Sequence, residues 1–258
     1  MSAEGTTRLA IDGKVATITF DRPAARNAMT WRMYEELAQA CATLATSETV
    51  RVTVLRGAGG KAFVAGTDIS QFADFTGEDG IAYEAKVEAF IGAVEALPMP
   101  TLAVVEGFAV GGGLALANAC DLRLAATGAR FGVPVASTLG NCLSAANLKR
   151  LTATLGEAWV KRMLLLAEMP TAEELAPTGY VCAVVPAASV EETLSALCAR
   201  LAGHAPLTLG ATKTALLRLR DALHPDDDDL IRRVYGSADF KAGIAAFTQK
   251  LKADWQGR

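Results

Sequence analysis

The sequence predicts an α/β fold in which strands and helices alternate and a helical region follows at the C-terminus. Short runs rich in β-branched residues, such as Val50–Leu55, alternate with segments whose apolar residues recur at helical spacing. Beyond Asn141 the helical spacing dominates. Because such alternation is typical of sheets covered by helices, we expect an α/β core over residues 1–200 and a helical region over residues 201–258.

The first third of the chain predicts a hairpin, a helix and two further strands. Two alternating segments flank Asp12-Gly13, a dipeptide typical of tight hairpins. Thr30 is suited to cap a helix, because its hydroxyl can accept a hydrogen bond from the first helical turn. The predicted elements are strands at Arg8–Ile11, Val15–Phe20, Val50–Leu55 and Ala62–Ala65, and a helix after Thr30.

The middle of the chain continues the alternation after an acidic, aperiodic segment, Gln71–Gly80, which we expect to be a mobile loop. Pro98 and Pro100 close the helix that follows this loop. The remaining predicted elements are helices at Ile81–Leu97 and Gly111–Ala119, and strands at Thr101–Val105, Leu122–Ala125, Arg130–Gly132 and Tyr180–Val185.

The composition argues against several classes of protein. The 258 residues carry a formal net charge of −3 with both signs mixed, so we expect no nucleic-acid partner. The five cysteines include no CxxC pair, so we expect neither disulfides nor a zinc site, and a reducing, cytoplasmic compartment. The most apolar stretch, Leu102–Cys120, contains Glu106 and several glycines, which favours a buried strand and helix over a membrane span.

Two glycine-bearing segments carry the strongest indication of chemistry. Residues 62–69, AFVAGTDI, and residues 106–116, EGFAVGGGLAL, each predict a strand that runs into a tight turn. Glycine lets the backbone approach a ligand closely, and a helix N-terminus presents unpaired N–H groups. Two such turns can hold one oxyanion between two N–H groups, although from spacing alone close packing is the more common role of glycine-rich turns. Neither a dinucleotide-binding glycine fingerprint nor a P-loop lysine is present.

Four segments follow one another along the chain: TFDRPAARNAMT, AFVAGTDI, GFAVGGGLALANACD and SADFKAGIAAFTQKLKADWQGR. In the same order they resemble motifs of the enoyl-CoA hydratase/isomerase (crotonase) family, such as AF-x-AG-x-D-I/L and G-x-A-x-GGG-x-E-L-A-x-x-CD. The resemblance implies a crotonase-like core of repeated ββα turns with a C-terminal helical trimerisation region. It also implies an enzyme that acts on an acyl-CoA thioester without a separate cofactor or metal ion.

The resemblance further implies which residues bind the substrate. In the family two peptide N–H groups hold the enolate oxygen of the thioester, and the matching positions are Thr67 and Gly112. Phe247 and Lys250 match residues that reach the CoA of a neighbouring subunit, which implies a homotrimer or homohexamer. The positions that match residues around the CoA are Ala25, Arg26, Ala65, Gly66, Asp68 and Ile69.

The C-terminal segment has apolar residues at three- and four-residue steps, which predicts one stripe along a helix. Such a stripe can cover either its own domain or a neighbouring subunit, and the resemblance favours the second. The residues of the stripe are Phe240, Ile244, Phe247, Leu251 and Trp255.

Two positions that carry glutamates in family hydratases differ here. Ala115 occupies the position on the helix after the glycine triplet, and Val135 occupies the position after Pro134. Hydration needs one group to activate water and another to supply a proton, and neither alanine nor valine can move a proton. The sequence therefore predicts little hydratase activity and, for an active enzyme, other acid–base groups. The acidic residues in or beside the predicted loop are candidates for such a group, and Glu84 is favoured among Asp74, Glu78, Asp79 and Glu84.

Asn141, Cys142 and Ser144 lie in a stretch that also departs from the family, and we expect them near the acyl pocket. His204 and His224 lie in segments that we expect to be peripheral, so a packed cysteine is favoured over a nucleophile at Cys142. Asn141 can orient a polar group of the acyl chain or cap a turn.

Three functions remain open from the sequence. The first is an enoyl-CoA hydratase/isomerase-family enzyme with non-standard proton-transferring groups. The second is a decarboxylase or hydrolase of the same family; in decarboxylation, loss of CO₂ creates the enolate without a base. The third is a non-catalytic acyl-CoA binder. All three require the paired N–H groups of Thr67 and Gly112.

Overall fold

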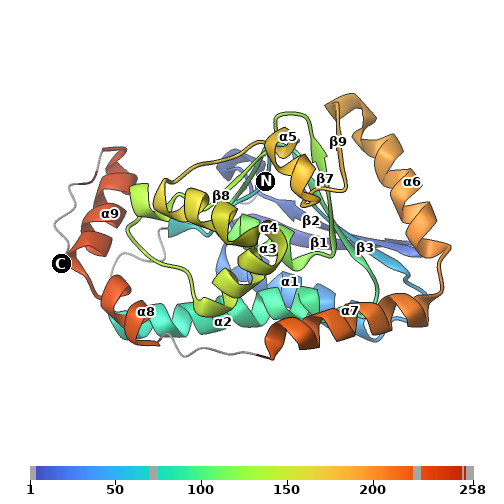
Figure 1. Cartoon of the computed structure of the whole chain (residues 1–258), viewed down its shortest axis with the longest axis horizontal. Helices are drawn as coiled ribbons and strands as arrows, with labels where there is room; N and C mark the ends of the chain where they lie inside the picture. The colour runs from blue at the N-terminus through green and yellow to red at the C-terminus, as the bar shows by residue number, and fades with distance from the viewer. Residues whose placement is uncertain (1–3, 70–74, 223–227, 252, 254–258) are drawn as a thin grey trace.

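A computed structural model describes residues 4–69, 75–222, 228–251 and 253 of the chain. Within this part, the strands form one six-stranded sheet, in the order β1-β2-β3-β5-β7-β9, and one three-stranded sheet, in the order β4-β6-β8 (Figure 1). The strands are β1 Thr6–Asp12, β2 Val15–Asp21, β3 Val52–Gly57, β4 Ala62–Ala65, β5 Thr101–Val105, β6 Phe108–Val110, β7 Leu122–Ala126, β8 Arg130–Gly132 and β9 Ala183–Val185.

The fold repeats a unit of two strands and one helix. β3, β5 and β7 lie in the larger sheet, whereas the strands that follow them, β4, β6 and β8, lie in the smaller sheet. Strands of successive units pair in parallel, since each helix carries the chain back to the same end of the sheet. The repeated ββα unit confirms the predicted fold class. The helices are α1 Trp31–Ala45, α2 Gly77–Glu95, α3 Gly112–Ala119, α4 Ala145–Leu165, α5 Ala172–Leu175, α6 Val190–Ala202, α7 Pro206–Asp221, α8 Asp228–Tyr235 and α9 Ala238–Gln249.

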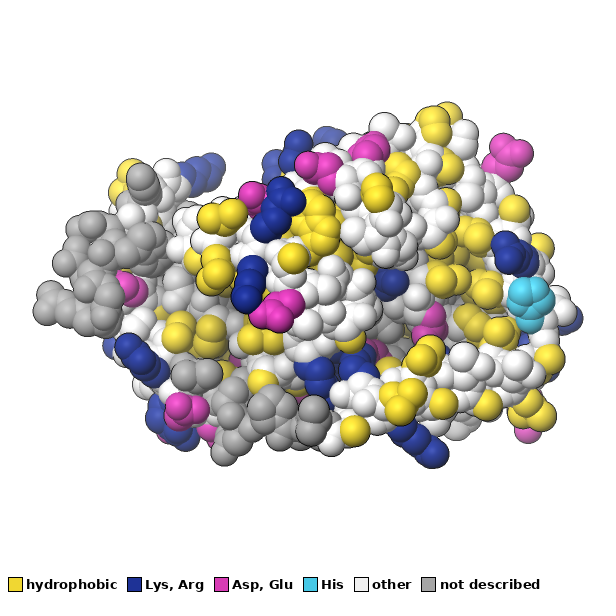
Figure 2. Space-filling model, viewed as in Figure 1, with side chains coloured by type: hydrophobic (Ala, Val, Ile, Leu, Met, Phe, Trp, Pro, Cys, Tyr) yellow, Lys and Arg dark blue, Asp and Glu magenta, His cyan; other side chains and the backbone are white. Residues whose placement is uncertain are grey.

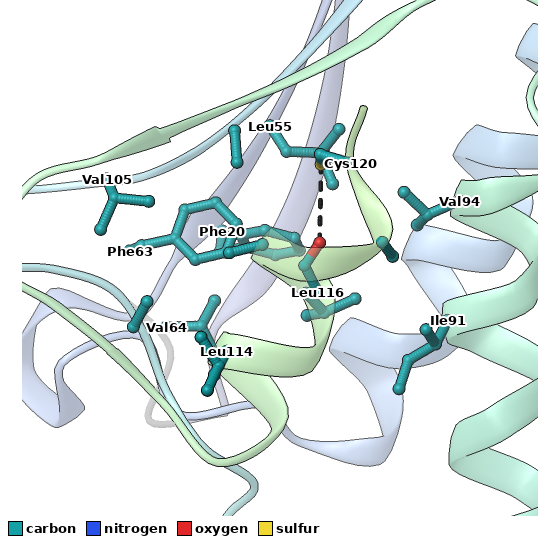
Figure 3. Close-up of a cluster of buried hydrophobic side chains, with 14 of the residues drawn as sticks. Phe20, Leu55, Phe63, Val64, Ile91, Val94, Val105, Leu114, Leu116 and Cys120 are labelled. Atoms are coloured by element: carbon teal, nitrogen blue, oxygen red, sulfur yellow. Dashed lines mark hydrogen bonds between the residues drawn. The ribbon is translucent and has the colours of Figure 1, made fainter. Parts of the chain in front are cut away.

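The main hydrophobic core surrounds the short helix α3. Phe20 of β2 and Phe63 of β4 contact edge to face, with ring centroids 5.5 Å apart. Figure 3 shows these rings on one side of α3 and the aliphatic side chains of α2 on the other. Full burial of one such side chain contributes about 1.5–3 kcal/mol, so α3 and its N-terminus are held firmly. Core residues labelled in Figure 3 include Leu55, Val105, Leu114, Leu116, Ile91 and Val94.

The apolar stretch Leu102–Cys120 forms β5, β6 and α3, as the sequence predicts; Ala103 and Val105 of β5 face this core, and Leu102 and Val104 face the other side of the sheet. The opposite face of the larger sheet is covered by α6, whose Val190 and Cys198 pack against Val54 and Val104. Among the described helices, none is long and apolar enough to cross a membrane.

The prediction of a loop over Gln71–Gly80 is wrong at its C-terminal end, and residues 71–74 lie outside the described part. Helix α2 begins at Gly77 because Thr76 and Asp79 form a reciprocal capping box. The glycines that suggest a loop serve helix packing instead. A Cβ added at Gly80 would lie 2.3 Å from Tyr235 Cγ, so glycine lets α2 and α8 approach closely.

Two other predicted elements are shorter in the structure. The predicted strand Tyr180–Val185 is reduced to β9, Ala183–Val185. The predicted C-terminal stripe ends with α9 at Gln249, because Lys250 adopts the left-handed conformation that terminates the helix. Leu251 therefore follows the helix, and Trp255 lies outside the described residues.

Candidate active site

The two glycine turns lie side by side at the ends of neighbouring strands. β4 and β6 pair in parallel, with Ala65 opposite Val110, so both strands end at the same edge of the smaller sheet. Gly66 follows β4 with a φ of +91°, and Gly111 follows β6 with a φ of +56°. Residues other than glycine rarely adopt a positive φ, because their Cβ would clash with the backbone. Gly66 and Gly111 therefore permit the sharp turns that lead into Thr67 and Gly112.

The peptide N–H groups of Thr67 and Gly112 are available to a ligand. A Cβ added at Gly112 would lie 3.9 Å from the Thr67 nitrogen, which shows how close the two turns come. Within the described residues, neither N–H group donates a hydrogen bond. Gly112 also begins α3, where the helix dipole favours negative charge. The arrangement can therefore hold an oxyanion.

The segment after β2 borders the first turn. Arg26 accepts a hydrogen bond from the Ala65 N–H at 3.1 Å, and Met29 donates to the Gly66 carbonyl at 2.9 Å. Arg22 forms an ion pair with Asp68 at 2.8 Å. The residues expected around the CoA thus lie on two neighbouring segments: Ala25 and Arg26 after β2, and Ala65, Gly66 and Asp68 at the end of β4. Ile69 follows Asp68 and packs against the cluster around Tyr235.

A small cavity of about 60 Å³ opens beside the second turn. Its walls come from α2, α3 and the segments between β8 and α4. Predicted residues that line it are Glu84, Gly112, Ala115, Val135, Asn141 and Cys142. Sequence reasoning missed Tyr83, Val87, Leu143 and Asn147, which also line it.

Glu84 is buried in this cavity wall, with 7% of its surface exposed. The Tyr235 hydroxyl donates to Glu84 Oε1 at 2.7 Å, and the Ser144 N–H donates to Oε2 at 3.2 Å. The Asn141 amide donates to the Tyr235 oxygen at 3.2 Å. Ser144 thus reaches the site through its peptide group, while its hydroxyl caps α4.

Three tyrosines complete the site: Tyr34 and Tyr235 are buried and Tyr83 is half-buried, and none of them was predicted as a site residue. The Thr67 hydroxyl lies 2.9 Å from the hydroxyl of Tyr34 and 2.9 Å from that of Tyr83. Tyr83 contacts Tyr235, with ring centroids 6.2 Å apart. Tyr83 precedes Glu84 on α2, and Tyr235 ends α8, so no local motif signals their meeting.

The tyrosines keep their protons at neutral pH. Burial raises the pKa of Tyr34 to about 12, although its hydrogen bond to Thr67 opposes the shift. Burial, followed by the neighbouring Tyr34, raises the pKa of Tyr83 well above its ordinary value. Burial and the charge of Glu84 do the same to the pKa of Tyr235. Each phenol can therefore serve as a stable hydrogen-bond donor.

Cys142 packs against the cluster that Ile231, Tyr235, Phe240 and Ile244 form, which fits a packed cysteine. Part of the predicted C-terminal stripe thus covers its own chain. Phe247 is 47% exposed and Lys250 ends α9, and neither lines the cavity of this chain.

Comparison with known proteins places this geometry in a family. The sequence profile described as enoyl-CoA hydratase/isomerase matches residues 10–258. The 2,3-dehydroadipyl-CoA hydratase of Escherichia coli (strain K12) is 32% identical over 250 residues, which cover 95% of this chain and 96% of that protein. The short-chain-enoyl-CoA hydratase of Clostridium acetobutylicum is 29% identical over 247 residues, covering 94% of each chain. The chain therefore belongs to the enoyl-CoA hydratase/isomerase family.

Solved structures agree with this assignment. A methylmalonyl-CoA decarboxylase in complex with 2-nitronate-propionyl-CoA has a TM-score of 0.90 and 26% identity, covering 98% of this chain and 99% of that one. An enoyl-CoA hydratase/carnithine racemase from Magnetospirillum magneticum has a TM-score of 0.79 and 32% identity, covering 98% and 96% of the two chains. Crotonase-fold enzymes of differing chemistry thus share this architecture.

Proposed function

We propose that the protein is an enzyme that binds an acyl-CoA thioester and stabilises its enolate oxygen with the N–H groups of Thr67 and Gly112. The observation that carries this proposal is the pair of N–H groups at adjacent glycine turns, which donate no hydrogen bond within the described residues and lie beside a cavity that can take an acyl group. Hydrogen-bond donors that await a developing oxyanion lower the barrier to enolate formation, because they need no reorganisation during the reaction. CoA enters as part of the substrate, without a separate cofactor.

Proton transfer in this site uses groups other than the two family glutamates. Ala115 and Val135 line the cavity at the positions where family hydratases carry them, and neither side chain titrates. A positioned acid or base typically contributes about 10²–10⁴-fold to a rate. We therefore expect weak hydration of crotonyl-CoA and stronger activity in a reaction that needs no second carboxylate.

Decarboxylation is the second candidate, and the structural likeness to methylmalonyl-CoA decarboxylase favours it. Loss of CO₂ from a malonyl-type thioester leaves the electron pair in the enolate, so the oxyanion donors do most of the work. This reaction needs a proton donor for the product rather than a base for the substrate.

A screen of acyl-CoA thioesters by mass spectrometry tests the proposal. Hydration adds the mass of water, decarboxylation removes that of CO₂, and isomerisation leaves the mass unchanged while altering chromatographic retention. Calorimetry with acetyl-CoA, NAD and ATP checks the ligand class. Binding of NAD without a response to acetyl-CoA would refute the proposal.

We also propose that the chain assembles as a homotrimer or a dimer of trimers through its C-terminal region, residues 201–258. Leu207, Leu216 and Leu219 of α7 are 62–87% exposed, and Figure 2 shows hydrophobic side chains along the α7 edge of the molecule. Exposed apolar patches of this kind often mark subunit interfaces. Light scattering should give the mass of three or six chains; a monomer with normal CoA binding would contradict the assembly.

A further inference from the structure

Glu84 differs in chemistry from every other residue that lines the acyl cavity. In the described part of the chain, it is the one acidic residue of the lining, which includes no lysine, arginine or histidine. Burying a carboxylate is costly unless hydrogen bonds replace its water, and an apolar side chain would avoid that cost. An acidic group kept at such a position beside a cleft is a candidate functional group.

The surroundings of Glu84 hold the carboxylate in place. Its two oxygens accept hydrogen bonds from the Tyr235 hydroxyl at 2.7 Å and the Ser144 N–H at 3.2 Å. Asn141 donates to the Tyr235 oxygen, which leaves the tyrosine proton directed at Glu84. Ser144 is also the N-cap of α4, where the helix dipole favours a negative charge. Two segments, α8 and the segment that precedes α4, thus converge on this side chain of α2.

We infer that Glu84 carries the proton in this site, and that the site accepts acyl-CoA thioesters whose acyl chain is uncharged, which disfavours the second candidate function, decarboxylation of a malonyl-type thioester. This inference rests on the proposed function, since it requires a thioester at Thr67 and Gly112. It extends that function in two ways. It names the proton-transferring residue, which lies on α2 and not at the positions of Ala115 and Val135, and it names the class of acyl chain.

The chemical step is a proton shift that needs no co-reactant. The Glu84 carboxylate takes a proton from the carbon next to the thioester carbonyl, and the C–H electron pair moves into the carbonyl to form the enolate. The N–H groups of Thr67 and Gly112 hold the enolate oxygen. With vinylacetyl-CoA, Glu84 then returns the proton to the terminal carbon, the electrons form the conjugated double bond, and crotonyl-CoA results.

The same carboxylate disfavours an acyl chain that carries its own negative charge. Like charges in a buried site repel, and the described lining offers no cation to offset a substrate carboxylate. Vinylacetyl-CoA should therefore bind more tightly than malonyl-CoA, and the Glu84→Gln variant should narrow that difference.

The test follows vinylacetyl-CoA in D₂O by mass spectrometry and compares wild-type protein with Glu84→Gln. Glutamine keeps the shape and one oxygen for Tyr235 but cannot accept a proton. We expect deuterium incorporation and crotonyl-CoA formation to fall by about 10²–10⁴-fold. Glu78→Gln is the matched control, because Glu78 lies on the same helix, pairs with Arg232 of α8 and has a side chain that is 70% exposed. It should leave both rates unchanged.

Binding and folding are measured separately, so the possible failures can be told apart. If the wild-type protein binds no acyl-CoA in calorimetry, the proposed function fails. If it binds without exchanging deuterium, or if folded Glu84→Gln exchanges at the wild-type rate, Glu84 is not the proton carrier and the oxyanion site stands. If circular dichroism shows that Glu84→Gln is unfolded, Glu84→Asp is used as the test variant. Aspartate withdraws the carboxylate by one methylene group, so deuterium exchange should slow. An unchanged exchange rate in Glu84→Asp would overturn the inference.

Discussion

The two parts of the proposed site, a carbonyl end and an acyl end, are built in different ways. At the carbonyl end, Thr67 and Gly112 offer backbone N–H groups, and the glycine that precedes each of them sets its position. At the acyl end, Glu84 meets Tyr235, which is 151 residues away in sequence, and Ser144, which is 60 residues away. A local turn places the first kind of group, whereas the packing of distant helices places the second. Activity should therefore be lost at the carbonyl end when a peptide N–H is removed, and at the acyl end when α2 and α8 shift relative to each other.

The largest effect should come from Gly112→Pro, which removes one oxyanion donor because proline has no N–H. Gly112 is the first residue of α3, a position that proline tolerates. Loss of one such donor typically lowers the rate by about 10²–10³-fold. Turnover of the substrate found in the screen, with circular dichroism to verify folding, measures the effect.

Gly112→Ala is the control for this prediction. Alanine keeps the N–H but adds a Cβ, which would come within 2.9 Å of the Tyr34 hydroxyl oxygen, a contact that proline shares. The difference between the two variants therefore isolates the N–H group. Equal activity of the folded alanine and proline variants would contradict the role of the Gly112 N–H.

The same contrast explains what the sequence could and could not predict. The alternation of strands and helices and the two glycine turns follow from residue spacing and local glycines, whereas the ββα repeat and the pairing of Thr67 with Gly112 were predicted from the resemblance to the family. The meeting of Glu84 with Tyr235 depends on how α8 packs against α2, which no local pattern encodes. Gly77 and Gly80 even suggested a loop, because the sequence alone does not distinguish a flexible glycine from one required by helix contact.

Tyr34 links the carbonyl end to the protein interior, and its ionisation should weaken folding at high pH. Its pKa is raised from 10.0 to about 12 by burial. Stability from the protonated phenol is thus complete below pH 10 and is lost as the pH rises toward 12. In that window the free energy of unfolding should fall by about 1.4 kcal/mol per pH unit from this group alone.

Urea unfolding of wild-type protein and Tyr34→Phe at several alkaline pH values measures this contribution. Phenylalanine does not ionise, so the stability of the variant should decline less steeply with pH. Parallel curves for the two proteins would show that Tyr34 does not contribute. Tyr83, Tyr180 and Tyr235 remain in both proteins and supply the common part of the decline.

Thr67→Ala should separate the side chain of the carbonyl end from its backbone. The peptide N–H survives, so the rate should change little. The buried hydroxyl of Tyr34 loses its hydrogen bond to the Thr67 hydroxyl, and a buried hydroxyl without a partner costs about 1–3 kcal/mol. Thr67→Ser keeps the hydroxyl and should recover most of that stability. A large rate loss in Thr67→Ala without a stability loss would show that the side chain acts directly on the substrate.

Two glycines of α2 allow the smallest effects to be compared within one helix. Gly80 faces α8, and a Cβ there would lie 2.4 Å from the Cβ of Tyr235, whereas a Cβ at Gly92 would meet nothing within 4 Å. Gly80→Ala should destabilise the protein, because overpacking costs about 1–3 kcal/mol and exceeds the gain in helix propensity. Gly92→Ala should stabilise it by about 0.5–1 kcal/mol, since alanine restricts the unfolded chain without meeting a clash.

Urea unfolding at neutral pH measures both changes in stability. Deuterium exchange into vinylacetyl-CoA shows whether displacement of Tyr235 in Gly80→Ala also affects Glu84. If both alanines stabilised the protein equally, close packing of α8 on α2 would not be what positions the acyl end.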